Sequence, residues 1–497
     1  MNEQDIAQQD LADDFEELIY LLDNNLGNLH RFYSDIKKVR KYIIGESYKL
    51  IINNLERSIY KNTAYKNGII KIKRQIGAEN NEKIRAEKHQ YQDLVRIITK
   101  LSAALITATD WQSPSFDFSL APAAGRQTGK ISGTVNDYKR DVHLDEKYYE
   151  EAYVREYIDA KYKFFLKAYL TNSGQAAFQT ILTYLSSENK IAGKVMVGRS
   201  SYFQYKQILK GTFGWKTILI PEMNNKVIME RIRKEKPGVI FIDSLTNSAE
   251  IAVPDLNSIL DYIYRTAEKD IYIIIDNTCL AVSCQPFLLR KTNKKVHLIT
   301  FESLNKYYQF GLDLVTAGVI ICDNREAGGI FEYRKHAGTN ISDTSVYALS
   351  KPNRKLLKKR LNRHQRNARE LAKYLSETDR QGDKIEKIIY PGLDNHPAYD
   401  WSKELEFKGS FLNIKFKEQY DNPKYMKKLM DLVIKTGRQK EVNIIGGTSF
   451  GLNTTRIYLT SLWTKFGKPF LRVSLGTEDY LTLTKIKAVF GKVIEKF

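Results

Sequence analysis

The stretch HLITFESLNKYYQFG, residues 297–311, places a single lysine, Lys306, just after a strand-like apolar run. Aromatic residues follow the lysine, and a second apolar run extends from Val315 to Cys322. At the edge of a buried sheet, desolvation disfavours the ammonium form of a lysine and releases its neutral amine, which can attack an aldehyde. The stretch therefore predicts two buried strands with a candidate reactive lysine between them.

Short apolar runs of this kind recur along the middle of the chain, and helical stretches separate them. They are KVMVG (194–198), KTILIP (216–221), GVIFID (238–243), IYIIID (271–276), HLITF (297–301) and VTAGVII (315–321). Strands that are apolar throughout and alternate with helices are typical of a largely parallel sheet covered on both faces. The sequence thus predicts an α/β fold.

Ligands bind such sheets at the carboxyl ends of the strands. Two strands end in a carboxylate, at Asp243 and Asp276, and Lys306 follows a third. We expect these three side chains to converge on one crevice.

The flanking regions differ from this core in pattern. Residues 1–112 space their apolar side chains at three and four and predict a helical extension, and 113–141 contain several Pro and Gly residues and predict a linker. The large α/β domain is expected over 142–352, and a smaller α+β domain over 353–497.

Composition limits the class of protein. The 497 residues are 42% apolar and include only three cysteines, which predicts a globular protein without a disulfide framework or a metal site. The acidic opening lacks the features of a secretory signal, and the longest apolar runs are strand-sized, so we expect a cytoplasmic protein without a membrane span.

The net charge of +20 is unevenly distributed, and its densest basic run is the segment 351–369. Residues 351–369 hold nine Lys/Arg and no acid. The few apolar positions there favour a solvated helix beside a domain boundary, and contact with an anion or nucleic acid is the alternative interpretation.

Lys306 and Asp276 together suggest one cofactor. Pyridoxal phosphate (PLP) needs a lysine amine for its aldehyde and a carboxylate beside its pyridine nitrogen, although either residue alone is more often a structural ion pair. Its phosphate needs N–H groups at a helix start, and Ser173 and Gly174 directly precede the amphipathic run AAFQTIL. An ordinary helix N-cap would look the same.

Six motifs in a fixed order extend this pattern: SGQAAF, DSLTNS, DNTCLAVSCQPF, ESLNKYY, GLDLVTAGVII and LRVSLGTED. Over roughly residues 135–490 the chain resembles the Cys/Met-metabolism family of PLP-dependent enzymes, the cystathionine synthase and lyase group. The resemblance implies fold type I, the aspartate-aminotransferase-like fold, with a mostly parallel sheet of seven strands in its large domain.

The resemblance also implies a role for individual residues. Lys306 would be the Schiff-base lysine and Asp276 the partner of the pyridine nitrogen. Asn247 would bind the phenolic oxygen of the cofactor, and Tyr202 would stack on its ring and assist catalysis. The phosphate would be bound by Ser173, Gly174, Gln175, Ser303 and Asn305, and the substrate carboxylate by Arg472.

The segment NDYKRD resembles an element that reaches into the active site of the neighbouring subunit. Tyr138, with a catalytic role, and Arg140 would bind the phosphate there, which implies a homodimer or homotetramer with shared active sites. The chain departs from the family at Asn305, where threonine is usual, and in SFGLNTT, where Thr454 replaces a glutamate. We expect Thr454 in the substrate pocket.

The predicted function is elimination or replacement at the β or γ carbon of an amino acid, often at a carbon–sulfur bond. Carbon–carbon bond formation also stays open. The alternative function is a regulatory or scaffolding protein that uses the helical extension and basic surface to bind an acidic partner or nucleic acid. With the cofactor positions filled, we expect a small amino-acid substrate and do not expect nucleic-acid binding.

Overall fold

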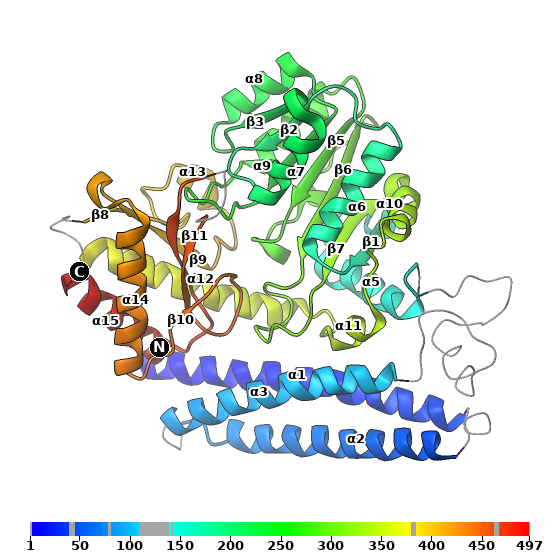
Figure 1. Cartoon of the computed structure of the whole chain (residues 1–497), viewed down its shortest axis with the longest axis vertical. Coiled ribbons are helices and arrows are strands. Elements are labelled where there is room, and N and C mark those ends of the chain that lie inside the picture. Colours follow the sequence, from blue (N-terminus) through cyan, green and yellow to red (C-terminus); the bar gives the residue numbers. More distant parts are fainter. Residues whose placement is uncertain are drawn as a thin grey trace.

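A computed structural model describes residues 2–38, 45–77, 81–108, 139–141, 143–378, 384–461 and 467–496. They form a large α/β unit, a smaller unit with its own sheet, and three N-terminal helices that run beneath both (Figure 1). Within these ranges, no helix combines the length and the apolar character that crossing a membrane requires.

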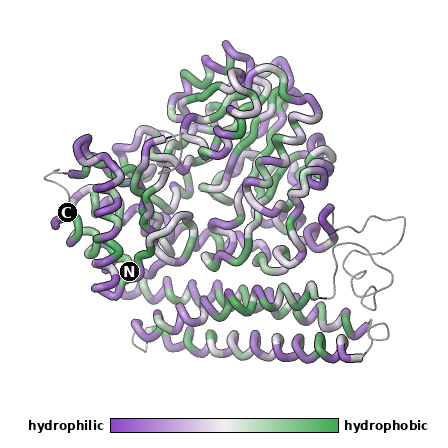
Figure 2. The backbone as a smooth tube through the Cα atoms, viewed as in Figure 1, coloured by the Kyte–Doolittle hydropathy of each residue, from purple (hydrophilic) through white to green (hydrophobic). Residues whose placement is uncertain are grey.

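The large unit is built on a seven-stranded sheet in the order β1-β7-β6-β5-β4-β2-β3. Strands β2 to β6 are parallel, and β7 is antiparallel to both of its neighbours. The strands are β1 (Leu166–Thr171), β2 (Val195–Gly198), β3 (Thr217–Ile220), β4 (Val239–Asp243), β5 (Ile271–Asp276), β6 (Val296–Ser303) and β7 (Gly318–Asp323). This confirms the predicted α/β fold, whose strands form the apolar centre of the unit in Figure 2.

The sheet is covered on both faces. Alternate residues of β4 enter different hydrophobic clusters, Ile240 and Ile242 on one face and Val239 and Phe241 on the other, as the two-residue period of a strand requires. The helices of this unit are α5 (Leu144–Tyr157), α6 (Gly174–Ser187), α7 (Phe203–Phe213), α8 (Asn225–Glu235), α9 (Leu256–Thr266), α10 (Asn324–His336) and α11 (Asp343–Ala348).

The register of the central strands aligns their carboxyl ends. Asp243 pairs with Asp276, and Asp276 pairs with Phe301 on β6, which ends shortly before Lys306. Strand β1 was missed in the sequence, because its run LKAYLT places two polar or half-buried residues among the apolar ones.

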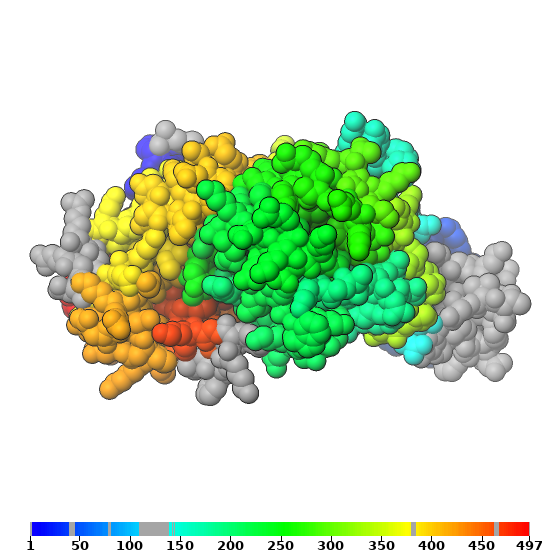
Figure 3. Space-filling model, turned by 90° about the horizontal axis from the view of Figure 1, so that it is seen from above, coloured from blue at the N-terminus to red at the C-terminus, as the bar shows by residue number. Residues whose placement is uncertain are grey.

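The smaller unit carries a five-stranded sheet in the order β10-β11-β12-β9-β8. Its strands are β8 (Ile385–Ile389), β9 (Phe411–Phe416), β10 (Ile445–Gly446), β11 (Arg456–Thr460) and β12 (Phe470–Ser474). Its helices are α12 (Arg354–Thr378), α13 (Tyr399–Ser402), α14 (Pro423–Gln439) and α15 (Tyr480–Lys496). The two units lie side by side when the molecule is seen from above (Figure 3).

The N-terminal helices are α1 (Glu3–Lys38), α2 (Glu46–Lys73) and α3 (Asn81–Ile106). Their apolar faces form one cluster with Phe310, Leu312 and Leu314, residues that follow Lys306 in the chain. The extension is therefore packed against the body of the protein.

The sequence predicts that the basic segment 351–369 is a solvated helix, and this prediction is wrong for one face of α12. Arg360 and Arg363 are buried, and carboxylates of α1 pair with them and with Arg366. Because acids of the same chain already neutralise this face, the surface that the alternative function needed is occupied.

Candidate active site

A cavity of about 1260 Å³ lies where the carboxyl ends of the large sheet meet the smaller unit. Asp243, Asp276 and Lys306 all line it, so the predicted crevice is present. The other predicted residues that line it are Ser173, Gly174, Gln175, Tyr202, Asn247, Ser303, Asn305 and Arg472.

Lys306 lies in the loop after β6. Its amine donates a hydrogen bond to Ser449 Oγ (2.9 Å) and lies over the ring of Phe450. Burial lowers the pKa of this amine, and the charge of Arg472 lowers it further. Both effects favour the neutral amine, the form that acts as a nucleophile or a base.

Asp276 ends β5 and is held by two neighbours. The hydroxyl of Tyr205 donates to Oδ2 (2.6 Å), and the backbone N–H of Thr278 donates to Oδ1 (3.0 Å). Burial raises the pKa of Asp276, and Lys306 is near enough for its charge to lower that pKa. A cation bound in the cavity would therefore find a fixed carboxylate.

The start of α6 forms a second wall. Ser173 is the N-cap, and its Oγ accepts from the N–H of Ala176 (3.0 Å). The next two N–H groups, of Gly174 and Gln175, lie in the first turn, where a helix offers no acceptor of its own. A Cβ on Gly174 would lie 2.7 Å from that of Ser303, so this close approach requires glycine.

Three more predicted residues have definite surroundings. Asn247 is at the cavity wall, and its Oδ1 has no hydrogen-bond partner among the described residues. The side-chain oxygen of Asn305 accepts from the N–H of Ala317 (2.9 Å). The backbone N–H of Tyr202 donates to Asp243 (3.3 Å), which fixes the start of α7 at the cavity.

Arg472, on β12, is a buried cation that lines the cavity. Its Nε and Nη1 have no hydrogen-bond partner within the described residues, and its guanidinium lies over the ring of Phe411. Burial lowers its pKa to about 10. Two buried N–H groups without acceptors are unfavourable, so an anionic ligand would be bound here by a bidentate pair of hydrogen bonds.

Two further predicted residues, Thr454 and Arg140, are not among the described residues that line the cavity. Thr454 does not line the cavity, and this corrects its assignment to the substrate pocket: the same loop presents Thr448, Ser449 and Phe450 instead. Arg140 is exposed and donates to Asp141 Oδ1 (3.1 Å). Tyr138 lies outside the described residues.

Two side chains at the reacting groups were missed in the sequence. Ser449 stands in TSFGLNTT, where the interpretation followed a family glutamate and so reached Thr454. Tyr205 stands in SSYFQY, where only Tyr202 was considered. Spacing identifies neither, because each meets its partner through the tertiary fold.

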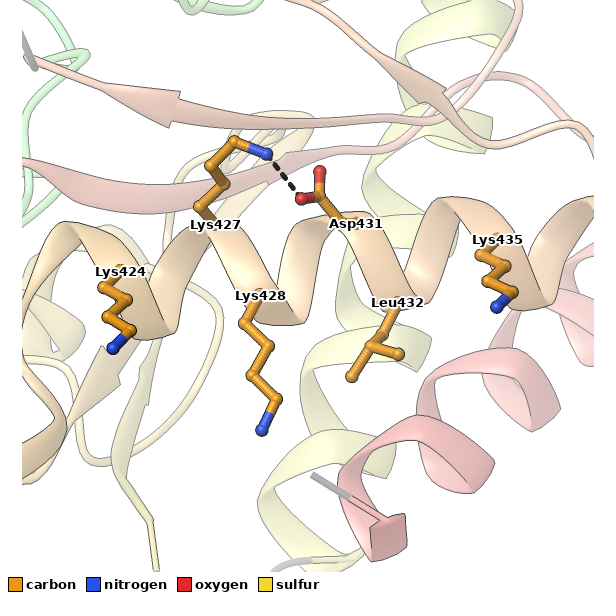
Figure 4. A pocket seen from close by; sticks show the side chains of 6 residues that line it. All are labelled: Lys424, Lys427, Lys428, Asp431, Leu432 and Lys435. Carbon is orange, nitrogen blue, oxygen red and sulfur yellow. Dashed lines mark hydrogen bonds and ion pairs between the residues drawn. The ribbon is translucent and has the colours of Figure 1, made fainter.

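A second depression lies on the outer face of α14 and has a different character (Figure 4). It is lined by Lys424, Lys427, Lys428, Asp431, Leu432 and Lys435. Lys427 pairs with Asp431 across one helical turn (2.5 Å). Such surface lysines do not form a built site, so the chemistry belongs to the cavity at Lys306.

Solved structures share the architecture. Cystathionine gamma synthase from Xanthomonas oryzae pv. oryzae superposes with a TM-score of 0.58 at 14% identity, over 78% of this chain and 92% of that one. Cystathionine gamma-lyase from Lactobacillus plantarum gives 0.58 at 18% identity, over 78% and 93%. At these identities the likeness establishes the fold.

Similar sequences have related names. The bifunctional enzyme flvA of Aspergillus flavus is 22% identical over 329 residues, 66% of this chain and 39% of that protein. Cystathionine beta-lyase of Coxiella burnetii is 24% identical over 246 residues, 49% of this chain and 60% of that enzyme. The matches thus span less than two thirds of these relatives.

The profile of one protein family, described as Cys/Met metabolism PLP-dependent enzyme, matches residues 111–440. This range is more than half of the chain and includes the large sheet, Lys306 and Asp276. The fold, the cavity and this match agree, and the chain belongs to the family of Cys/Met metabolism PLP-dependent enzymes.

Proposed function

We propose that the protein is a PLP-dependent lyase or transferase that eliminates or replaces a group at the β or γ carbon of an amino acid, with the broken or formed bond usually between carbon and sulfur. The observation that carries the proposal is the shared cavity of a buried lysine and a buried carboxylate, Lys306 and Asp276. The family supports the cofactor, and relatives named as cystathionine lyases support the bond type.

The cavity residues fit the cofactor. Arg472 and Asn247 have buried polar atoms without partners, and the glycine at position 174 leaves the first turn of α6 open to a phosphate. Bound PLP would supply an aldehyde for amines and a ring that draws electrons from the α carbon of the substrate.

Lys306 would hold the cofactor and then act as the base. Its lowered pKa favours the neutral amine, the form that can take the α-proton and return a proton to the product. Ser449 accepts a hydrogen bond from this amine and so fixes the direction in which the amine acts.

Asp276 would keep a proton on the pyridine nitrogen by charge pairing, and Tyr205 and Thr278 hold the carboxylate in place. Tyr202 would stack on the ring, and Asn247 would bind its phenolic oxygen. The phosphate would be bound by Ser173, Gly174, Gln175, Ser303 and Asn305.

Arg472 would bind the substrate carboxylate as a bidentate pair, which lysine cannot reproduce. The phosphate of a neighbouring subunit would be bound by Tyr138 and Arg140, so that the active protein is a homodimer or homotetramer. The exposure of Arg140 in the single chain agrees with a partner-facing role.

A substrate panel tests the proposal. Purified protein with added PLP is offered cysteine, cystathionine and an O-acylated homoserine, and ammonia, oxoacid and thiol products are measured, with Lys306→Ala as the control. We expect turnover of at least one compound by the parent and none by the variant. A parent that binds PLP but turns over no amino acid of this panel would contradict the proposed reaction.

A further inference from the structure

The N-terminal extension meets the body of the protein through a row of buried charges. Asp10, Asp14 and Glu17 are spaced by four and three residues and therefore share one face of α1. Arg360, Arg363 and Arg366 form the matching face of α12, and the pairs are Arg366 with Asp10 (2.8 Å), Arg363 with Asp14 (2.5 Å) and Arg360 with Glu17 (3.0 Å).

Arg360 links this row to a loop of the active site. One end of its guanidinium, Nη1, donates to Glu17 Oε2. The other end, Nη2, donates to Asn453 Oδ1 (2.7 Å) and to the backbone oxygen of Gly451 (3.2 Å). The side chain of Arg360 is fully buried, so water cannot replace these acceptors without opening the interface.

This loop lies directly against the reactive lysine. A Cβ on Gly451 would lie 2.7 Å from the carbonyl carbon of Lys306, and the φ of Gly451 is +78°. A Cβ on Gly311 would meet both Asn453 Oδ1 (2.1 Å) and Arg360 Nη2 (2.3 Å). Two glycines thus let the Lys306 loop, the Ser449 loop and Arg360 pack with no side chain between them.

The same loop carries Ser449, which accepts the hydrogen bond of the Lys306 amine. A second connection is apolar. Phe310 is buried under α1, where the ring of Tyr20 meets it edge-on at 6.0 Å. The Lys306 loop therefore rests on α1 directly, and the Ser449 loop rests on it through Arg360.

We propose that helix α1 is a positioning element of the active site, in which Glu17 holds Arg360 so that Arg360 fixes the loop 449–453 and presents the Ser449 hydroxyl to Lys306. Glu17 and Arg360 are positioning residues, since neither lines the cavity. The inference rests on the proposed function of Lys306. It gives the extension a function inside its own chain, where the binding of an acidic partner had been the alternative.

The physical cause is the cost of a buried guanidinium that has lost its carboxylate partner. With Glu17 absent, Arg360 must turn toward other acceptors or toward water. Both movements would weaken its hydrogen bonds to Asn453 and Gly451. The loop would then open more often, and the Ser449 hydroxyl would leave the Lys306 amine.

Three variants of the full chain isolate this contact. Glu17→Leu keeps the helix and removes the acceptor, and Glu17→Gln retains one acceptor oxygen. Glu16→Leu is the matched control, since Glu16 stands next to Glu17 on α1 but forms its ion pair, among the described residues, with the part-exposed Lys359 (3.0 Å). Amide hydrogen exchange of the segment 448–454 is compared with that of β5.

We expect exchange of 448–454 to rise about tenfold or more in Glu17→Leu, to lie between parent and Glu17→Leu in Glu17→Gln, and to stay at the parent rate in Glu16→Leu. Exchange in β5 stays unchanged in all three. This order of the three variants, with β5 unchanged, is what a positioning role predicts. A general loss of stability would raise exchange in β5 as well.

The cofactor provides a second readout. The pH at which the visible absorption of the PLP-loaded protein changes should shift in Glu17→Leu, because the Ser449 hydroxyl would no longer lie beside Nζ of Lys306. It should stay at the parent value in Glu16→Leu. Altered exchange in a protein that binds no PLP would refute the proposed function but would uphold the coupling, meaning that Glu17 fixes the loop 449–453 through Arg360. Normal exchange of 448–454 in Glu17→Leu with PLP bound would overturn the coupling alone.

Asn453→Ala covers the case in which Glu17→Leu fails to fold. This variant leaves the pair of Glu17 and Arg360 intact. It removes the shorter of the two bonds from Arg360 to the loop, together with the long bond that Asn453 Oδ1 accepts from the Thr477 hydroxyl (3.4 Å). Faster exchange of 448–454 is again expected, with β5 at the parent rate. Unchanged exchange in Asn453→Ala would show that the bond from Arg360 to Asn453, the shorter of its two bonds to the loop, does not hold the loop, and the proposal would fall.

Discussion

Lys306 and Asp276 owe their chemistry to burial in one cavity. Burial lowers the pKa of the amine and raises that of the carboxyl, and each group partly offsets the shift of the other. Hydrogen bonds from the Lys306 amine to Ser449 and from Tyr205 to Asp276 then fix their directions. The reacting groups are therefore defined by neighbours as much as by their own identity.

Removal of the Tyr205 hydroxyl should weaken the cofactor site. Tyr205→Phe loses one charge-assisted bond to Asp276, about 1.5–3 kcal/mol, so we expect the Kd for PLP to rise about 10- to 100-fold. Tyr184→Phe is a matched control, because Tyr184 donates at the same 2.6 Å to Glu326, and Glu326 does not line the cavity. Equal PLP affinity of both variants in a fluorescence titration would refute the role of Tyr205.

Arg472 should decide substrate binding without affecting the cofactor. Arg472→Lys keeps a positive charge but loses the bidentate geometry, so we expect kcat/KM to fall about 10- to 100-fold, mainly through KM. The visible absorption of the bound cofactor should stay as in the parent. An unchanged KM for the amino-acid substrate would place its carboxylate elsewhere.

At the residue scale, sequence reasoning reached the groups that end strands and begin helices. Asp276 ends an apolar strand, Lys306 follows one and Gly174 precedes an amphipathic run, so their places could be inferred from pattern and order. Ser449 and Tyr205 could not, since their partners are distant in sequence. Tyr205 meets Asp276 within the large unit, whereas Ser449 meets Lys306 only where the two units pack.

At the element scale, burial of both faces made the parallel strands easy to predict. Strand β1 was missed because only alternate residues of LKAYLT are fully apolar and buried. The face of α12 was misjudged for a related reason. Nine Lys/Arg without an acid look solvated, whereas the carboxylates that pair with three of the arginines are more than 340 positions away on α1.

The contact between α3 and the start of α15 should become less stabilising at low pH. Burial alone would raise the pKa of Asp479, but hydrogen bonds from Arg85 and the charge of Lys88 lower it to about 2. A folded-state pKa below the unfolded value of about 3.9 stabilises the fold above about pH 4, and this stabilisation is lost as pH falls toward 2. It amounts to about 2 kcal/mol.

We expect the unfolding free energy of the parent, measured with urea, to fall between about pH 4 and pH 2 more steeply than that of Asp479→Asn. The variant should already be less stable at neutral pH, because Arg85 loses the carboxylate to which it donates and Lys88 loses a nearby negative charge. Parallel pH profiles of the two proteins would contradict the ion pair with Arg85.

At the scale of the whole molecule, two units enclose one cavity and the N-terminal extension packs against them. The large sheet supplies Asp276 and Lys306, the smaller sheet supplies Arg472, and the extension supports the loops between them. We propose that a second copy completes the site through Arg140, which in this chain is exposed.

Complementation tests the shared site. Lys306→Ala and Arg140→Ala are each expected to be nearly inactive, and their coexpression should restore about one quarter of the parent activity, because mixed dimers contain one intact site. Restoration requires that the arginine act on the neighbouring lysine. Coexpressed variants that stay inactive, although mixed dimers are isolated, would place Arg140 outside the active site.

The most direct test of the central claim is to locate the bond between cofactor and protein. PLP-loaded protein is reduced with borohydride and digested, and mass spectrometry identifies the modified lysine. We predict one pyridoxyl adduct, on Lys306, and no visible absorption band in Lys306→Ala. An adduct on another lysine, or a Lys306→Ala protein that keeps the band of the parent, would contradict the account.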